Sequence, residues 1–339
     1  MNLFKKNIFS TPSPTFSKLA DSETGDLISI INNYYPALQV KEIHRIGAFE
    51  LNSNNWKIVT NQEEYILKRA PLEKLEALKS QAEWTSELSS TDFPTLIFLN
   101  NSNGKIISID KQHIYCMTIF KSGDYFGASI NEWSDLMCHL KKMYDYSLKV
   151  KQSSILPKRL FFTEEENQLI QKVKASDNIK QQDVETIVFE YEKMKLFYNQ
   201  NKHQYNTSVF HVDIHPHNLI FHNNKLLLLT DFEAFLTTTV EISLGFGLYK
   251  CARQLLAINE SNTQKELTEI VHKLRTQFEF HFPKNNFKDL LVSAKIDVLK
   301  RLVYILRELS EKGESKWLFI FQTQLDSLEE INQLEKILL

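Results

Sequence analysis

The segment 210–233 constrains the fold of this chain more than any other part of the sequence, because polar residues typical of active sites flank a hairpin pattern. Two apolar runs, Leu219–Phe221 and Lys225–Leu229, are separated by a short polar turn. This pattern predicts two antiparallel strands joined by a tight turn. The hairpin would bring Asp231, after its second strand, back beside Asn218, before its first. Further polar candidates precede it at His211, Asp213, His215 and His217.

The part of the chain before this segment has the pattern of an antiparallel sheet. Short runs rich in β-branched and aromatic residues alternate with polar turns. Helical spacing of leucines interrupts them once. The expected strands are 39–45, 55–60, 65–69, 94–99, 105–109 and 113–120, and the expected helices are 26–35 and 71–89. Residues 10–24, which contain Pro, Ser and Thr, are expected to form a loop or leader.

The part of the chain after residue 124 is mainly helical, because its apolar residues recur with the period of a helix. The expected helices are 130–146, 164–174, 184–199, 243–258, 266–280, 287–311 and 316–338. This layout predicts an α+β, protein-kinase-like, two-lobed fold with a small antiparallel β N-lobe and a larger, mainly helical C-lobe. We place an N-terminal leader and helix at 1–38, a nucleotide-binding N-lobe at 39–120 and a catalytic, acceptor-binding C-lobe at 121–339.

Composition narrows the partners and the compartment. The chain has 40 Lys and Arg against 42 Asp and Glu, so no basic excess points to nucleic acid or an anionic membrane surface. Its three cysteines lie far apart, without a C-x-x-C pair. No apolar run approaches the roughly 20 residues of a membrane helix. We therefore expect a soluble, cytoplasmic protein with reduced thiols and with no nucleic-acid or membrane partner.

The polar residues of segment 210–233 suit phosphoryl transfer. A hydroxyl nucleophile needs a nearby carboxylate to take its proton, and Mg²⁺ needs oxygen ligands beside the nucleotide phosphates. Asp213 can serve as the base. Asn218 offers an amide oxygen to a metal ion, and Asp231 offers a carboxylate from the far side of the hairpin.

These residues resemble motifs of the aminoglycoside phosphotransferase and choline kinase superfamily. Segment 211–218 resembles its His-Gly-Asp-x-His-x-x-Asn loop, and segment 231–233 resembles its later Asp-Phe/Trp-Glu/Asp motif. The likeness covers roughly residues 39–258 in the order of the family. Segment 45–58 resembles the loop over the phosphates and the next strand, 65–69 the strand with the phosphate-binding Lys, and 114–123 the hinge that receives adenine.

This resemblance implies the activity and the residue roles. The implied reaction is transfer of the γ-phosphoryl group of ATP, with Mg²⁺, to the hydroxyl of a small-molecule acceptor, an alcohol, amino alcohol or sugar. The catalytic residues would be Asp213 and His215, and Mg²⁺ would be held by Asn218 and Asp231. His211 is expected to brace the loop. The nucleotide-binding residues would be Lys68, Glu83 as its ion-pair partner, Ser53, Asn54 and Met117, with Glu76 and Glu87 as alternatives to Glu83.

Two residues depart from the family pattern. Val212 follows the first His of the loop, where Gly is usual. Ser243 stands where an Asp would start a helix and brace the loop, although Ser is a competent N-cap. These departures keep open an alternative function, a kinase-like binding or structural protein without catalysis, as in spore-coat relatives. The phosphate loop has the single Gly47 in place of G-x-G-x-x-G, which argues against a protein kinase.

Other interpretations remain open for several residues. An extended backbone would place His211, Asp213, His215 and His217 on one side, as in a transition-metal site. Glu233 is either a metal ligand or substrate contact, or a surface residue. The run 164–166 either attracts a cationic substrate or begins a helix. Trp133, Tyr304, Trp317 and Phe319 form either a cage for an ammonium group or part of the core.

Overall fold

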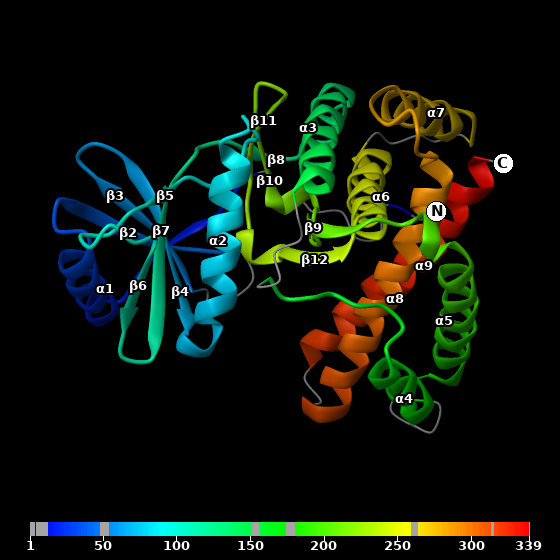
Figure 1. The fold of residues 1–339 in the computed structure, drawn as a ribbon, viewed down its shortest axis with the longest axis horizontal. Coiled ribbons are helices and arrows are strands. Elements are labelled where there is room, and N and C mark those ends of the chain that lie inside the picture. Colours follow the sequence, from blue (N-terminus) through cyan, green and yellow to red (C-terminus); the bar gives the residue numbers. More distant parts are fainter. Residues whose placement is uncertain are drawn as a thin grey trace.

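The computed structural model describes Phe4 and residues 13–47, 54–150, 156–173, 180–258, 264–312 and 315–338. Figure 1 shows two parts, a twisted sheet flanked by helices and a larger part made mainly of helices. This arrangement confirms the predicted α+β, kinase-like layout of a small antiparallel β part followed by a helical one.

The smaller part is built on one antiparallel sheet. In spatial order its strands are β1 (Phe16–Lys18), β2 (Val40–Ile46), β3 (Asn55–Thr60), β4 (Glu64–Pro71), β7 (His113–Ile119) and β5 (Phe98–Leu99), and β6 (Ile107–Asp110) also pairs with β7. The predicted strands agree to within two residues at each end, apart from 94–99, of which only Phe98–Leu99 is a strand.

The expected loop at 10–24 is wrong at Phe16–Lys18, which form strand β1, and at residues 21–24, which begin a helix. β1 pairs with β2, with Phe16 opposite Ile46. Helix α1 (Asp21–Tyr34) begins within the same range, and its first turn carries two acidic side chains that favour a helix N-terminus. The apolar residues of α1, Leu27 and Ile31, pack against one face of the sheet. The helical spacing that indicated this helix begins only at Leu27, which explains the late predicted start.

Helix α2 (Leu75–Ser89) follows a 3₁₀ turn at Leu72–Lys74. Figure 1 shows α2 between the sheet and the rest of the molecule. Its buried face, which includes Leu78, Ala82 and Trp84, belongs to the large core shared with the helical part. Helix α2 therefore connects the sheet to the helical part.

The larger part contains seven helices in its described residues. They are α3 (Ile130–Lys149), α4 (Glu164–Val173), α5 (Gln181–Asn201), α6 (Val240–Ile258), α7 (Gln264–His281), α8 (Phe287–Lys312) and α9 (Ser315–Ile337). The predicted helices agree to within three residues at each end. Helix α6 is buried along most of its length and packs on α8, which in turn packs on α9.

The predicted hairpin consists of β10 (Leu219–His222) and β11 (Lys225–Leu229). Asn223 and Asn224 have φ values of 50° and 60°, the left-handed conformation that a two-residue type I′ turn requires. Asp135 of α3 holds the hairpin by accepting a hydrogen bond from the backbone N–H of Leu226 at 2.8 Å. A third strand, β8 (Asp124–Tyr125), pairs with β10.

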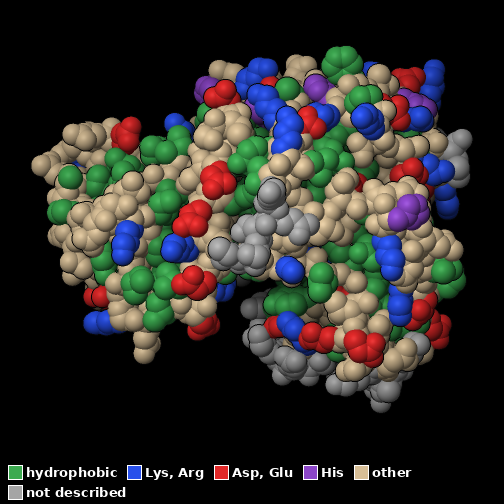
Figure 2. Space-filling view, viewed as in Figure 1, with side chains coloured by type: hydrophobic (Ala, Val, Ile, Leu, Met, Phe, Trp, Pro, Cys, Tyr) green, Lys and Arg blue, Asp and Glu red, His purple; other side chains and the backbone are tan. Residues whose placement is uncertain are grey.

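A second ladder, which the sequence did not reveal, flanks the polar residues of segment 212–234. Strand β9 (Thr207–His211) pairs with β12 (Phe235–Thr239), with His211 opposite Phe235. The polar residues after β9 and before β12 therefore lie at one end of the ladder. Charges of both signs are interspersed on the face seen in Figure 2, and the molecule is hollowed at the lower edge of that view, between the two parts. No helix in the described ranges has the length and hydropathy to cross a membrane.

Candidate active site

A cleft of about 670 Å³ separates the sheet from the hairpin β10–β11. Its two sides are formed by segments far apart in the sequence, the sheet on one side and the hairpin with the residues that follow it on the other. The polar and hinge residues that line it include Asn54, Lys68, Cys116, Thr118, Phe120, Lys121, His217, Asn218, Thr230, Asp231 and Glu233. Three of the residues predicted to bind phosphate or metal, Lys68, Asn218 and Asp231, therefore face one space.

Lys68 lies on β4, and its ammonium group contacts two carboxylates. Nζ lies 2.7 Å from Oε2 of Glu233 and 3.4 Å from Oδ1 of Asp231. Burial alone would lower the pKa of Lys68, but Asp231 and Glu233 together raise it above its ordinary value. The side chain is therefore a fixed cation at the cleft. Glu233, whose role the sequence left open, is the ion-pair partner of Lys68.

The predicted ion pair between Lys68 and Glu83 is wrong in this structure, because Glu83 is exposed on α2. The alternatives Glu76 and Glu87 are exposed as well. Helix α2 instead presents Gln81, whose Nε2 donates to the backbone carbonyls of Glu233 at 2.5 Å and Phe235 at 3.1 Å. An uncharged Gln carries no sequence signal for this contact.

Asp213 lies in the loop after β9, where basic side chains approach both of its carboxylate oxygens. Oδ1 accepts a hydrogen bond from Nη1 of Arg301 at 2.9 Å, and Oδ2 lies 3.5 Å from Nε2 of His215. Burial would raise the pKa of Asp213, but Arg301 and His215 hold it well below its usual range. The carboxylate is therefore ionised at neutral pH, as the acceptor of a hydroxyl proton must be.

Asn218 and Asp231 meet where the hairpin closes. The backbone N–H of Thr230 donates to the carbonyl of Asn218 at 2.9 Å, and Nδ2 of Asn218 donates to the carbonyl of Asp213 at 2.8 Å. Asp231 has φ 57° and ψ 58°, a left-handed conformation that non-glycine residues rarely adopt outside functional sites. Amide and carboxylate oxygens are ligands that Mg²⁺ prefers, so these two side chains fit a magnesium ion.

His211 is fully buried behind the loop, and both of its ring nitrogens face backbone groups. Nε2 lies 3.0 Å from the carbonyl of Thr230 and 3.1 Å from that of Asp231, while Nδ1 accepts from the N–H of Asp213 at 3.3 Å. These partners assign the proton to Nε2. Burial lowers the pKa of His211, so the ring is neutral and ties the two halves of the site together.

The transition-metal interpretation does not fit this arrangement, because hydrogen bonds to the backbone already use both nitrogens of His211. His217 packs against the ring of Tyr125, with ring centres 4.8 Å apart, and burial lowers its pKa to about 4. Across the described part of the chain, no three His, Cys, Asp or Glu side chains gather as a metal site.

Of the predicted nucleotide contacts Ser53 and Asn54, the structure describes Asn54. Asn54 lines the cleft, and its Oδ1 accepts a hydrogen bond from Nη2 of Arg69 at 2.7 Å. Ser53 lies outside the described residues. Gly47, which follows β2, also lines the cleft.

The side chain of Met117, a predicted nucleotide contact, does not face the cleft, because it is fully buried on the opposite face of the sheet, among residues packed beneath α1. Successive residues of a strand point to opposite faces, so its neighbours Cys116 and Thr118 line the cleft instead. Burial raises the pKa of Cys116 to about 12, which keeps this thiol protonated.

Val212, where Gly is usual in the family that the loop resembles, fits because both of its backbone polar groups are hydrogen-bonded. Its N–H donates to the carbonyl of Ala234 at 2.9 Å, and its carbonyl accepts from Nη2 of Arg301 at 2.8 Å. Its φ is negative, so the backbone here does not require glycine.

The prediction that Ser243 caps its helix is wrong. Helix α6 begins at Val240, so Ser243 lies inside the first turn, where it is fully buried. The nearby Glu241 holds the residue before β9, because its Oε2 accepts from the backbone N–H of Asn206 at 2.8 Å, and its Oε1 accepts from the phenol of Tyr144 at 3.1 Å.

The sequence did not reveal Arg301, which holds the carboxylate of Asp213 in place. Its Nε donates to Oδ1 of Asp297 at 2.6 Å, and its guanidinium lies 3.9 Å from the ring centre of Phe246. Arg159 donates to the same Asp297 oxygen at 3.0 Å. The only signal in the sequence is the four-residue spacing of Asp297 and Arg301 on one helix, which says nothing about Asp213.

Comparison with known proteins gives a fold. No protein-family model matches the sequence, and no curated protein matches it significantly. A solved amicoumacin kinase in complex with AMP-PNP superposes with a TM-score of 0.65 at 10% identity, over 93% of this chain and 94% of that one. A choline kinase from Streptococcus pneumoniae has a TM-score of 0.58 at 11% identity, over 92% and 100% of the two chains. A microcompartment-associated aminopropanol kinase has a TM-score of 0.61 at 9% identity, over 94% of this chain and 98% of that one.

These similarities span nearly the whole length of each chain. This chain therefore has the protein-kinase-like fold shared by the aminoglycoside phosphotransferases and choline kinase.

Proposed function

We propose that the protein is an ATP-dependent kinase that transfers the γ-phosphoryl group to a hydroxyl of a small molecule. The observation that carries this proposal is the convergence of Lys68, Asp213, Asn218 and Asp231 on one site. Solved proteins of the same fold are kinases of amicoumacin, choline and aminopropanol, which supports a small-molecule acceptor. The proposal includes a cytoplasmic location, where ATP is available.

Each residue would have a separate part in the reaction. The nucleotide would occupy the cleft with its phosphates toward Lys68, which is held in place by Glu233. Asn218 and Asp231 would hold Mg²⁺, which neutralises phosphate charge when it is bound. Asp213 would orient the acceptor hydroxyl and take its proton, since Arg301 keeps the carboxylate ionised. Holding both reactants in line is the main catalytic contribution expected of such a site.

The proposal is tested by measuring ATP consumption with a panel of alcohols, amino alcohols and sugars. We expect turnover with at least one acceptor, and we expect Asp213→Ala to abolish it while nucleotide still binds. The matched control is Asp21→Ala, which removes an exposed carboxylate from α1. Activity without nucleotide, or full activity in Asp213→Ala, would contradict the mechanism.

The alternative, a kinase-like protein that binds or has a structural role without catalysis, predicts a different result. A site that has lost its function would not need to bind nucleotide with Mg²⁺. Thermal unfolding with millimolar ATP and Mg²⁺ separates the two, because a ligand that binds only the folded state raises the melting temperature. No rise would favour the alternative.

A further inference from the structure

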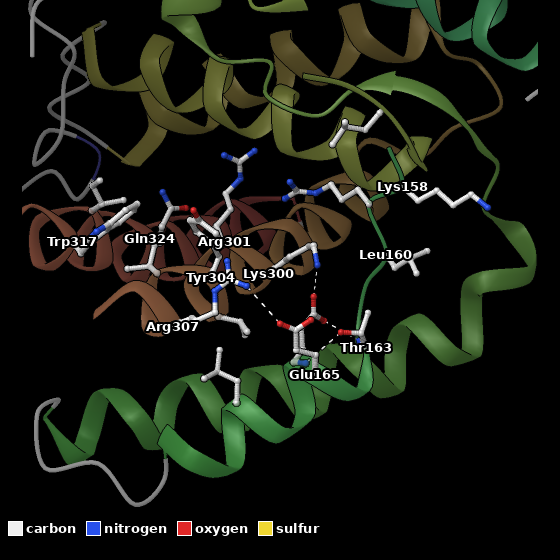
Figure 3. Close-up of a pocket in the computed structure, with 17 residues that line it drawn as sticks. Lys158, Leu160, Thr163, Glu165, Lys300, Arg301, Tyr304, Arg307, Trp317 and Gln324 are labelled. Carbon is white, nitrogen blue, oxygen red and sulfur yellow. Dashed lines mark hydrogen bonds and ion pairs between the residues drawn. The ribbon is translucent and has the colours of Figure 1, made fainter. Parts of the chain in front are cut away.

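A second cavity, of about 630 Å³, lies in the helical part (Figure 3). Its walls come from α4, α8, α9 and segment 158–160, which runs beside β12 through a 2.8 Å hydrogen bond from the N–H of Arg159 to the carbonyl of Thr237. Arg301 lines this cavity and also contacts Asp213 at 2.9 Å. The cavity shares no lining residue with the nucleotide cleft. It is therefore placed to hold the molecule whose hydroxyl meets Asp213.

Basic side chains outnumber acidic ones in the lining. The charged residues are Lys158, Arg159, Lys300, Arg301 and Arg307 against Glu165 and Glu166. Figure 3 shows Lys300 and Arg307 of α8 pointing across the cavity toward α4. Lys300 contacts Glu166, and Nη1 of Arg307 lies 3.5 Å from Glu165. Both carboxylates of the lining are thus already paired with cations.

The acidic run at the start of α4 has a structural role. Glu166 accepts a hydrogen bond from the backbone N–H of Thr163 at 3.0 Å, while its own N–H donates to Oγ1 of Thr163 at 3.3 Å. This is a capping box, which stabilises a helix N-terminus. Of the two meanings left open for residues 164–166, the helix start is the one that these contacts support.

The aromatic residues of the cavity do not form a cage for an ammonium group. The rings of Tyr304 and Trp317 meet edge to face, with centres 6.0 Å apart. The guanidinium of Arg307 lies 4.9 Å from the ring centre of Tyr304, so an ammonium would compete with this cation for the ring. Trp133 is fully buried elsewhere in the core, and Phe319 is 71% exposed.

Two buried polar atoms of the lining lack a hydrogen-bond partner among the described residues. One is the donor Nε of Arg159, whose Nη2 is held by Asp297 at 3.0 Å. The other is the acceptor Oε1 of Gln324, a side chain only 8% exposed. Buried polar atoms usually have partners, so these two suit a ligand that both accepts and donates hydrogen bonds. An alcohol with an anionic group does so.

We propose that this cavity binds the acceptor of the kinase, and that the acceptor is an alcohol carrying a carboxylate or phosphate group. The inference rests on the proposed kinase function. Four of the five basic residues already have a carboxylate partner, which is Asp297 for Arg159 and Arg301, Glu166 for Lys300 and Glu165 for Arg307. An anion would add charge-assisted hydrogen bonds to donors that these pairs leave unused, such as Nε of Arg159. A cationic amino alcohol would be repelled by these cations, and the carboxylates of the lining that could bind it already pair with Lys300 and Arg307. Arg301 contributes to both the base and the acceptor site, so it places the hydroxyl of the bound anion near Asp213.

Calorimetric titration of the full chain with four probes tests this proposal. Glycerol 3-phosphate and glycerate carry the two anionic groups, glycerol carries none, and choline is a cation. Titrations are made without nucleotide and with Mg²⁺ and AMP-PNP, so that binding in the nucleotide cleft is recognised. We expect at least one anion to bind in both conditions, and glycerol and choline to bind more weakly. The anion that binds more tightly shows whether the cavity recognises a phosphate or a carboxylate.

Three variants assign the binding to this cavity. Lys300→Gln combined with Arg307→Gln should lower the affinity for the anion by about tenfold or more, because two positive charges that face the cavity are removed. Glu165→Gln changes a side chain that is 80% exposed. It should raise the affinity for the anion, because a carboxylate that competes for Arg307 is lost. Lys193→Gln on α5, a half-exposed lysine with an acidic partner 3.8 Å away, is the control and should change nothing.

The proposal is overturned if no anion binds, if choline binds more tightly than both anions, or if the double variant and Glu165→Gln leave anion affinity unchanged. Glu165→Gln gives this answer even if the double variant does not fold. Failure of the kinase proposal has a different signature, which is absence of AMP-PNP binding while the anion still responds to the variants.

Discussion

Asp213 and Arg301 lie 88 residues apart in the sequence, and their side chains form an ion pair at 2.9 Å. The same guanidinium donates to the carbonyl of Val212 at 2.8 Å and to Asp297 at 2.6 Å. One arginine of α8 thus holds the carboxylate of Asp213 and the backbone beside it, and ties the loop after β9 to α8.

Arg301→Gln should shift the pH dependence of activity. In the native protein the ion pair lowers the pKa of Asp213, so its stabilising effect is present above the unfolded-state value of about 4 and is lost as pH falls toward the folded-state value. Without Arg301, burial acts unopposed and raises the pKa. We expect the acid limb of the kcat/KM profile to move up by about one pH unit or more. Arg275→Gln, in a surface pair on α7, is the control. An unchanged acid limb would contradict this account.

Lys68→Ala should weaken nucleotide binding. Lys68 is the cation of the cleft, and hydrogen bonds between charged groups contribute about 1.5–3 kcal/mol, so the affinity for AMP-PNP with Mg²⁺ should fall about tenfold or more. Lys57→Ala is a matched change, because Lys57 lies on the neighbouring strand β3 with a carboxylate partner 2.8 Å away. Equal effects of the two substitutions in calorimetric titrations would count against a phosphate-binding role for Lys68.

Gly245→Ala should destabilise the protein through the packing of α6 on α8. A Cβ at Gly245 would lie 2.1 Å from the backbone oxygen of Leu290, which cannot move without shifting α8. Overpacking of this kind costs about 3 kcal/mol of unfolding free energy. Gly25→Ala, in α1, has nothing within 4 Å and should stabilise by about 1 kcal/mol. Urea denaturation measures both, and a neutral Gly245→Ala would show that the two helices pack less closely.

Lys250→Met should flatten the dependence of stability on pH. Burial and the nearby Arg253 lower the pKa of Lys250 to about 7. Between pH 7 and pH 9 the unfolded chain holds a proton that the folded chain has released, so stability rises with pH by about 2 kcal/mol from this group. Denaturation at both pH values should show the rise in the native protein and a smaller rise in the variant. The same slope in both proteins would mean that Lys250 titrates normally.

The fold was predictable from the sequence because its helices and strands have strong periodic patterns. The polar turn that contains Asn223 and Asn224 predicted the hairpin. The hairpin in turn predicted that Asn218 and Asp231 lie side by side. Short pairings were not predictable, since β1 and β8 contain only three and two residues and carry no pattern of their own. The division at residues 38 and 120 remains a prediction.

The candidate site was predictable only where a motif is local. Asn218 and Asp231 flank one hairpin, and Asp213 lies five residues before Asn218, so spacing along the chain indicates that the three residues lie near one another. The prediction that Glu83 pairs with Lys68 failed because the rotation of α2 about its axis decides which of its side chains reaches the site. A sequence determines this rotation poorly. Arg301 was missed because its contact with Asp213 depends on how α8 packs.

The measurement that tests the central claim most directly is calorimetric titration of AMP-PNP into the native protein, Asp231→Asn and Asp213→Asn, with and without Mg²⁺. We predict binding that requires Mg²⁺ in the native protein, survives in Asp213→Asn and is lost in Asp231→Asn. No binding at millimolar nucleotide, or binding that neither Mg²⁺ nor Asp231→Asn alters, would contradict the assignment of this cleft as a phosphotransfer site.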